Sequence, residues 1–270
     1  MKKLTRMLVV AVVALISLTL FSSKVRADDS SSEAIQKIQK AGVLKVGVKQ
    51  DVPNFGYYSA EAGQYEGLEI DLGKKIAKQL GVKVEFTPVT AQTREALLDN
   101  GQIDILIATY TITKERQASY AISEPYYYDE IGFLVDRSKG YKTIDDLNGL
   151  TIGVAQGSTT KAAIEEYGKA NHLKFKFVQL GSYPELAISL YANRINAFSV
   201  DKSILSGYVS KKTKILSQGF NVQEYGIAAT KANQGLINDI NTLLSEWKAD
   251  GELQKLYDKY HLTPATPSEN

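Results

Sequence analysis

The chain has 270 residues, enough for one large domain or two lobes, and its 44% apolar and 23% charged residues are typical of a globular protein. A formal net charge of +2 without any basic run argues against a nucleic-acid partner. The absence of cysteine excludes disulfides, thiol catalysis and Cys-ligated metals, and His172 and His261 lie too far apart in sequence to suggest a zinc site or a Ser-His-Asp triad. We therefore expect neither a metal nor a cofactor.

The first 27 residues have the pattern of a secretory signal peptide. A basic start precedes an apolar run over residues 7–21, and the segment VRA at 25–27 supplies small residues at the usual cleavage positions. Because that run is short for a membrane span, we expect cleavage after Ala27 rather than retention as an anchor. Since no cysteine stands at the cut, we expect an exported protein without a lipid anchor, in the periplasm or at the outer cell surface.

Strands and helices alternate in the first half of the chain. The patterns predict a helix at 32–41, a strand at 43–48, a loop at 49–67, a helix at 68–80, a strand at 82–89, a helix at 93–100 and a strand at 103–108. This order favours a parallel sheet with helices on both faces.

The predicted helix at 68–80 has an apolar stripe that repeats every four residues from Leu68, and Gly81 ends it. Glu69 and Asp71 lie in its first turn. At this spacing the two carboxylates point to different sides of a helix, so we interpret them as matches to the helix dipole rather than as an acid/base pair.

A second unit begins near Arg137. After a strand at 130–136, the patterns predict a helical turn at 144–147, strands at 150–155, 175–178, 195–200, 215–216 and 224–230, and helices at 161–170, 184–193, 204–209, 236–248 and 253–260. The segments 100–104 and 193–197 echo each other, which suggests two related α/β lobes. A pocket between two domains is a common place for a ligand.

The segment 109–116 follows the apolar strand predicted at 103–108 and contains three threonines and Arg116. Ligands of open α/β sheets lie at the carboxyl ends of the strands. Hydroxyl and N–H groups there can bind a carboxylate, and Arg116 can clamp it with two parallel hydrogen bonds. The alternative is a helix N-cap, Thr111 or Thr113, followed by a solvated arginine.

Together these segments resemble the extracellular solute-binding proteins of bacterial amino-acid ABC importers, family 3. The resemblance covers nearly the whole chain after the leader, and it rests on YEGLEIDL at 65–72, TITKER at 111–116, SEPY at 123–126 and Asp201. Leu68 stands where the family usually has an aromatic residue. The aspartate/glutamate-binding members are the most similar, through the segments VTAQTR at 89–94, GVAQ at 153–156 and AFSVDKS at 197–203.

The resemblance implies a two-lobed α/β fold of the periplasmic-binding-protein type II, in which each lobe is a mainly parallel sheet flanked by helices. Two hinge strands, at 130–136 and 224–230, would connect the lobes, which would close on the ligand. Lobe 1 would comprise residues 32–135 plus 229–262 and lobe 2 residues 136–228, with a flexible tail at 263–270.

The resemblance also implies the site that holds the backbone groups of an amino acid. Arg116 would take the α-carboxylate with help from the donors Thr111, Ser158, Thr159 and Thr160. Asp201 would take the α-ammonium from the other lobe, although a helix N-cap is its alternative role.

Lys49 and Arg94 match positions that meet the ligand side chain in relatives. With Arg116 they would set three cations against Asp201, which favours a second carboxylate on the ligand. The alternative is that both are solvated surface residues. The residues that would complete the pocket are Phe55, Thr109, Tyr110, Gln156 and Tyr183.

We therefore expect a monomeric binding protein, not an enzyme, that delivers aspartate or glutamate to a membrane permease. Glutamine or another polar amino acid is one alternative. A secreted dehydratase-like enzyme and a surface adhesin on the same fold are others, since fold alone excludes neither.

Overall fold

The computed structural model describes residues 29–266 of the chain. The predicted signal peptide and the last four residues of the predicted tail lie outside this range. None of the helices within the described range combines the length and hydrophobicity that a membrane crossing needs.

The sheet of the first lobe has the strand order β5-β1-β6-β14-β7. The central strand β1 (Val43–Val48) pairs in parallel with β5 (Lys83–Pro88) and β6 (Ile105–Ile107). The strand β14 (Ala228–Thr230) is antiparallel to both β6 and β7 (Tyr120–Ile122). Because β14 comes from the last part of the chain, this lobe is built from two separate segments.

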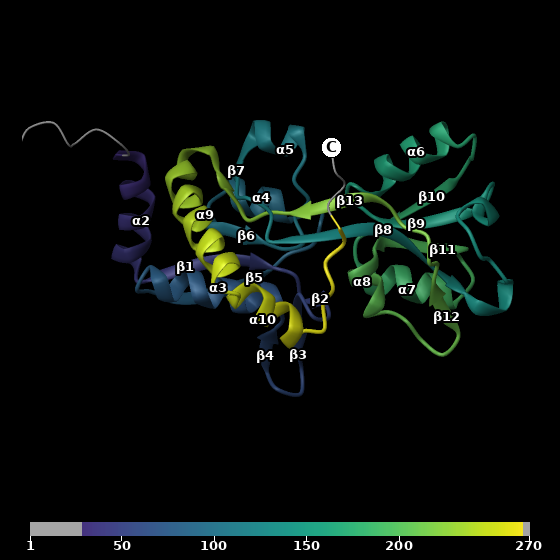
Figure 1. Ribbon diagram of the computed structural model, residues 1–270, viewed down its shortest axis with the longest axis horizontal. Helices are drawn as coiled ribbons and strands as arrows, with labels where there is room; N and C mark the ends of the chain where they lie inside the picture. Colours follow the sequence, from purple (N-terminus) through teal and green to yellow (C-terminus); the bar gives the residue numbers. More distant parts are fainter. Residues whose placement is uncertain (1–28, 267–270) are drawn as a thin grey trace, which may run out of the picture.

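Helices cover the first sheet on both faces (Figure 1). They are α2 (Asp29–Ala41), α3 (Leu68–Gln79), α4 (Arg94–Asp99), α5 (Lys114–Ser119), α9 (Gln234–Ala249) and α10 (Glu252–Lys259). The apolar stripe of α3 is buried, as its spacing predicts. Its Asp71 pairs with Lys259 of α10 at 2.6 Å, so this carboxylate joins two helices as well as matching the dipole.

The region predicted as a loop at 49–67 is a small antiparallel sheet, which corrects that prediction. Its strands are β2 (Asp51–Val52), β3 (Gly56–Ser59) and β4 (Gln64–Glu66). Strands of two to four residues are too short for a period-two pattern to show in the sequence. Gly67, with φ of 127°, then brings the chain so close to the Phe55 carbonyl that any Cβ would overlap it.

The sheet of the second lobe has the order β10-β9-β11-β8-β12, and β13 also pairs with β8. The strands are β8 (Tyr127–Asp136), β9 (Thr151–Ala155), β10 (Lys176–Leu180), β11 (Ala197–Asp201), β12 (Thr213–Ile215) and β13 (Phe220–Tyr225). The neighbours β10, β9 and β11 are parallel, whereas β8 is antiparallel to β11. The helices are α6 (Thr160–Ala170), α7 (Tyr183–Tyr191) and α8 (Lys202–Ser206), with short 3-10 turns at Arg137–Lys139, Asp145–Leu147 and, in the first lobe, Lys231–Asn233.

Two antiparallel strands, β8 and β13, run side by side between the lobes (Figure 1). β8 starts three residues before the strand predicted at 130–136, and the strand predicted at 224–230 is divided into β13 and β14. The division has a local cause. The N–H of Gly226 donates to the Tyr110 carbonyl and the N–H of Ile227 donates to Ser123 Oγ, so neither N–H group takes part in the strand pairing of β13 or β14. The lobe boundaries remain our proposal.

The two lobes lie against each other, because one hydrophobic cluster includes side chains from both. The Tyr208 hydroxyl donates to the Asp51 carbonyl across the contact. The chain after α10 is tied to β8: Ala265 N–H donates to the Tyr128 carbonyl at 2.9 Å, and the Tyr127 hydroxyl donates to the Thr263 carbonyl at 3.1 Å. The first part of the predicted flexible tail is therefore bonded to the fold.

Candidate functional site

Two arginines share one tyrosine ring at the carboxyl end of β6. The guanidinium carbons of Arg94 and Arg116 lie 4.7 and 4.1 Å from the centre of the Tyr110 ring. Glu95 accepts hydrogen bonds from the Tyr110 hydroxyl at 2.9 Å and from Arg116 Nε at 3.2 Å, and the Thr111 carbonyl accepts one from Arg116 at 2.8 Å. Cation–π contact and these bonds fix the separation of the two guanidinium groups.

Arg94 is a buried cation without a carboxylate partner within residues 29–266. It is 3% exposed, and one of its terminal nitrogens donates to the carbonyls of Ala108 at 2.8 Å and Thr109 at 3.2 Å. Its Nε has no partner among the described residues. Burial and the neighbouring Arg116 lower its pKa to about 10, so it stays charged at neutral pH. Glu69, Glu95 and Asp201 act on this charge only at longer range, without an ion pair, and a buried charge without a direct partner is costly.

Lys49 lies between the lobes and is also buried. Its ammonium is 3.1 Å from Asp51 Oδ1 and 4.6 Å from the centre of the Tyr183 ring, which α7 contributes from the second lobe. Burial lowers the pKa of Lys49, and Asp51 opposes this shift. The alternative that Lys49 and Arg94 are solvated surface residues is therefore wrong.

The first turn of α3 contributes a buried acid, Glu69. Its Oε1 accepts from Thr109 N–H at 2.6 Å and from the Tyr126 hydroxyl at 2.5 Å, whereas Oε2 has no partner among the described residues. Burial raises the pKa of Glu69 to about 7. Thr109, which donates the first of these bonds, has φ of 45°, which is strained for a residue with a Cβ. Dipole matching alone is thus an incomplete interpretation of Glu69.

These acids correct the charge count made from the sequence. Three cations were set against Asp201 alone, but Asp51 is paired with Lys49 and Glu95 with Arg116, and Glu69 is buried nearby. The count left out these three acids because they come from β2, α4 and α3, and no pattern in the sequence indicates that these elements lie together. Arg94 is the cation that still lacks a charged partner in the described chain.

Asp201 ends β11 and is 5% exposed. It precedes α8, yet its side chain makes no cap hydrogen bond, so capping is not its role here. Asp129 of β8 accepts the Ser203 N–H instead, at 3.1 Å, and Asp201 accepts from the Tyr225 hydroxyl. Arg94 and Arg116 are close enough to oppose the rise that burial causes in the pKa of Asp201.

Most polar groups of the loop before α6 are already bonded or buried within the described chain. The hydroxyls of Ser158 and Thr159 donate to Ala155 O at 2.7 Å and to Gln223 Oε1 at 3.0 Å, and Thr160 is buried. Thr111 and Thr159 line a common cleft of about 420 Å³ between the lobes. Gln156 is exposed and its N–H donates to Leu180, so the structure does not bring this predicted residue to the buried group.

Phe55 is fully buried among tyrosines from the hinge strands. Its ring centre is 5.0 Å from that of Tyr127 and 5.9 Å from that of Tyr225. These rings belong to the hydrophobic cluster that includes side chains from both lobes, so Phe55 has a role in packing.

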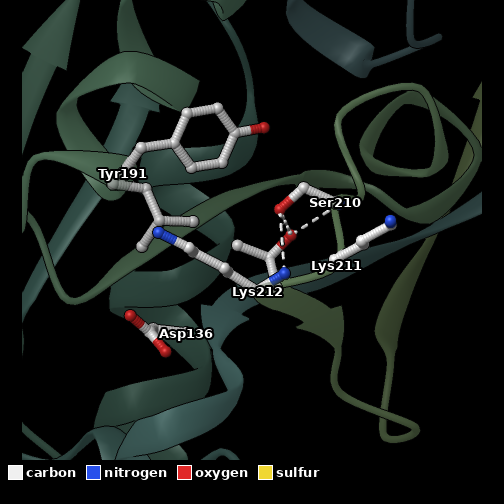
Figure 2. Close-up of a pocket in the computed structure, with 7 residues that line it drawn as sticks. Asp136, Tyr191, Ser210, Lys211 and Lys212 are labelled. Carbon is white, nitrogen blue, oxygen red and sulfur yellow. Dashed lines mark hydrogen bonds between the residues drawn. The ribbon is translucent and has the colours of Figure 1, made fainter.

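A second hollow, of about 390 Å³, lies in the second lobe between α7 and β12 (Figure 2). The residues that line it include Asp136, Tyr191 and Lys212, and none of the predicted site residues is among them. In its wall the Ser210 N–H donates to Thr213 Oγ1 at 2.8 Å. We assign no site to it.

The close approach of the lobes gives a testable prediction. A Cβ on Gly157 would lie 2.7 Å from the Ala91 carbonyl of the other lobe. We expect Gly157→Ala to lower ligand affinity by about tenfold or more, because it hinders closure. Gly140→Ala is the matched control: Gly140 has φ of 75°, against 78° at Gly157, but nothing lies within 4 Å of its Cβ position. Equal affinities of the two variants, measured by calorimetry, would contradict this account.

The raised pKa of Glu69 predicts that the free energy of unfolding depends on pH. Its pKa of about 7 in the fold exceeds the ordinary value of 4.5, so the protonated form is favoured and stability falls as pH rises from the lower to the higher value. Glu69→Gln imitates the protonated form and should be more stable than wild type above about pH 7, by up to about 3 kcal/mol, and equal to it in acid. Urea unfolding at several pH values checks this, with Glu61→Gln, an exposed position, as the control. A constant difference between wild type and E69Q across pH would refute it.

The family model of the bacterial extracellular solute-binding proteins, family 3, matches residues 44–263. The chain belongs to this family. It is 31% identical to the ABC transporter glutamine-binding protein GlnH of Bacillus subtilis (strain 168), over 96% of this chain and 97% of that protein. It is 26% identical to an L-glutamate/L-aspartate-binding protein of Pseudomonas aeruginosa, over 92% and 86% of the two chains.

Solved structures show the same fold. An ancestral amino-acid-binding protein, described as a precursor of cyclohexadienyl dehydratase, superposes with a TM-score of 0.77 at 31% identity, over 84% of this chain and 99% of that one. The two-lobed α/β fold expected from the resemblance is therefore confirmed, as is the family. This solute-binding protein is thus related to carriers of amino acids for ABC importers.

Proposed function

We propose that this solute-binding protein binds an acidic L-amino acid, aspartate or glutamate, between its lobes and delivers it to the permease of an ABC importer. The observation that supports the acidic ligand best is Arg94, which is buried, charged and without an acidic partner among the described residues. A ligand carboxylate placed against its Nε would supply the missing charge. Lys49, held over Tyr183, would be the second donor.

The other two charges of the ligand suit residues on opposite lobes. Arg116 would bind the α-carboxylate, together with Thr111 and the first amides of α6, which have no side-chain cap. Asp201 would accept hydrogen bonds from the α-ammonium. Since only the closed form satisfies both ends, the ligand itself would stabilise closure.

Glutamine is the alternative, and one observation favours it. The buried Oε2 of Glu69 is an unpartnered acceptor, which could bind the N–H of a ligand amide but would repel a carboxylate when ionised. The similarity to a glutamine-binding relative points the same way. The charge of Arg94 weighs more, because Arg94 stays charged at neutral pH, whereas Glu69, with a pKa of about 7, can take up a proton and lose its charge.

The remaining parts of the proposal concern the protein's setting. We infer that it is exported with its signal peptide removed after Ala27, carries no lipid anchor, acts as a monomer and is not an enzyme. The similarity to an ancestral precursor of a dehydratase keeps a catalytic role as the alternative.

A thermal-shift screen of all standard amino acids tests the proposal. Because a ligand that binds only the folded state raises the melting temperature by mass action, aspartate or glutamate should give the largest rise. Absence of a rise with any amino acid would contradict binding, and turnover of a cyclohexadienyl acid would support the enzyme instead. Loss of uptake of the same amino acid when the protein is deleted tests the permease partner.

A further inference from the structure

Asp129 is a buried acid of hinge strand β8 to which the site described above gives only a capping role. It is 3% exposed, and it accepts from the backbone N–H groups of Ser203 and Glu130 at 3.1 and 2.8 Å. The hydroxyl of Tyr225, on hinge strand β13, faces Asp129 Oδ2 at 3.4 Å and also contacts Asp201 Oδ2. One phenol therefore lies between two buried carboxyl groups.

The number of hydrogens limits what this arrangement can be. A tyrosine hydroxyl carries one hydrogen and can donate it to one carboxylate. The second contact is favourable only if the other carboxyl group carries a proton and donates it to the phenol oxygen. Two buried carboxylates that face one hydroxyl therefore favour the state that holds one additional proton.

The groups around the pair do not neutralise both acids. Around Asp129 lie the hydroxyls of Tyr127 and Tyr225, and Glu130 beside it is paired with Lys202. Around Asp201 lie Tyr183 and the guanidinium groups of Arg94 and Arg116. Burial raises the pKa of both acids, and Asp201 raises that of Asp129 further.

We propose that Asp129 and Asp201 share one proton through Tyr225, and that the ammonium group of a bound amino acid displaces this proton to solvent. This inference rests on the proposed role of Asp201. Asp129 is then a positioning residue: it acts through Tyr225 and sets the charge of the ammonium acceptor without touching the ligand.

The sign of the pH dependence follows from the displacement. At low pH the pair must lose its proton before Asp201 can accept the ammonium fully, so binding is weaker there. Affinity should rise with pH by roughly ten- to hundredfold from about pH 6 to about pH 8, in proportion to the fraction of a proton released.

The test is calorimetric titration of the purified protein with the amino acid that binds best, in buffers of different ionisation enthalpy. The dependence of the observed heat on the buffer gives the number of protons released. For wild type we expect between about half a proton and one proton near neutral pH. Asp129→Asn keeps an oxygen for the Ser203 N–H but removes the second acid. This variant should release almost no proton and should bind more tightly than wild type at about pH 6.

Controls separate this proposal from a purely structural role and from the other buried acid. Glu69→Gln should keep the proton release or increase it, because the ionised Glu69 would take up a proton when a ligand carboxylate approaches. Loss of release in E69Q but not in D129N would overturn the proposal. Weaker binding of D129N at every pH, with unchanged proton release, would also overturn it. If D129N does not fold, infrared difference spectra of wild type decide: ligand should remove a protonated-carboxyl band, and an unchanged band contradicts the proposal. Failure of all amino acids to bind would instead contradict the proposed function.

Discussion

Arg116→Ala should weaken the binding of every amino acid by at least about thirtyfold. Arg116 is the guanidinium that Tyr110 and Glu95 fix in place, and we propose that it clamps the α-carboxylate, which all amino acids share. Truncation of one partner of a desolvated, hydrogen-bonded charge pair costs about 2–5 kcal/mol, which is roughly thirtyfold to several thousandfold in affinity. Calorimetric titration with aspartate, glutamate and glutamine measures the loss.

Glu95→Gln is the control for Arg116. It removes the negative charge next to Arg116 but keeps an oxygen for the bonds from Tyr110 and Arg116. We expect this variant to bind within about tenfold of wild type, because a partly exposed ion pair contributes little. Near-native affinity of the R116A variant would refute the carboxylate assignment.

Arg94→Met should weaken acidic ligands by about a hundredfold and glutamine by less than about tenfold. Methionine keeps an unbranched apolar side chain but removes the buried charge that we pair with the ligand side chain, together with its contact over the Tyr110 ring. Circular dichroism checks that the variant folds, since the carbonyls of Ala108 and Thr109 lose their donor. Affinities for glutamate and glutamine then give the ratio.

Lys49→Met provides the comparison for Arg94. Asp51 already neutralises Lys49, so its removal should change the ratio of acidic ligand to glutamine less than removal of Arg94 does. An equal loss of glutamate and glutamine binding in the R94M variant would exclude Arg94 from the specificity pocket.

The long elements of the fold could be predicted because their patterns are local. The apolar run of β1 and the four-residue stripe of α3 identify a buried strand and a half-buried helix without knowledge of their neighbours. The small sheet β2-β3-β4 could not be predicted in this way. Its strands are held by pairing and by the close approach of Gly67 to Phe55, which depend on tertiary contact.

The basic part of the candidate site could be predicted better than its acidic part. Lys49 and Arg116 come soon after strands, where ligands of α/β sheets bind. Glu69 is paired with Thr109 and Tyr126, 40 and 57 residues away, so nothing local marks it as buried. For Asp129 a signal was present: the alternation of β8 places it on the same face as the buried Tyr127 and Ile131.

Calorimetric titration with glutamate and glutamine tests the central claim, that a ligand carboxylate pairs with Arg94, most directly. The two ligands have nearly the same shape and differ in side-chain charge. The protein should first be unfolded and refolded to remove any amino acid carried through purification. We expect tight one-to-one binding of glutamate, or of aspartate in a parallel titration, with glutamine at least about tenfold weaker. Glutamine bound as tightly as the acidic ligands, or more tightly, would contradict the claim and favour the amide contact to Glu69.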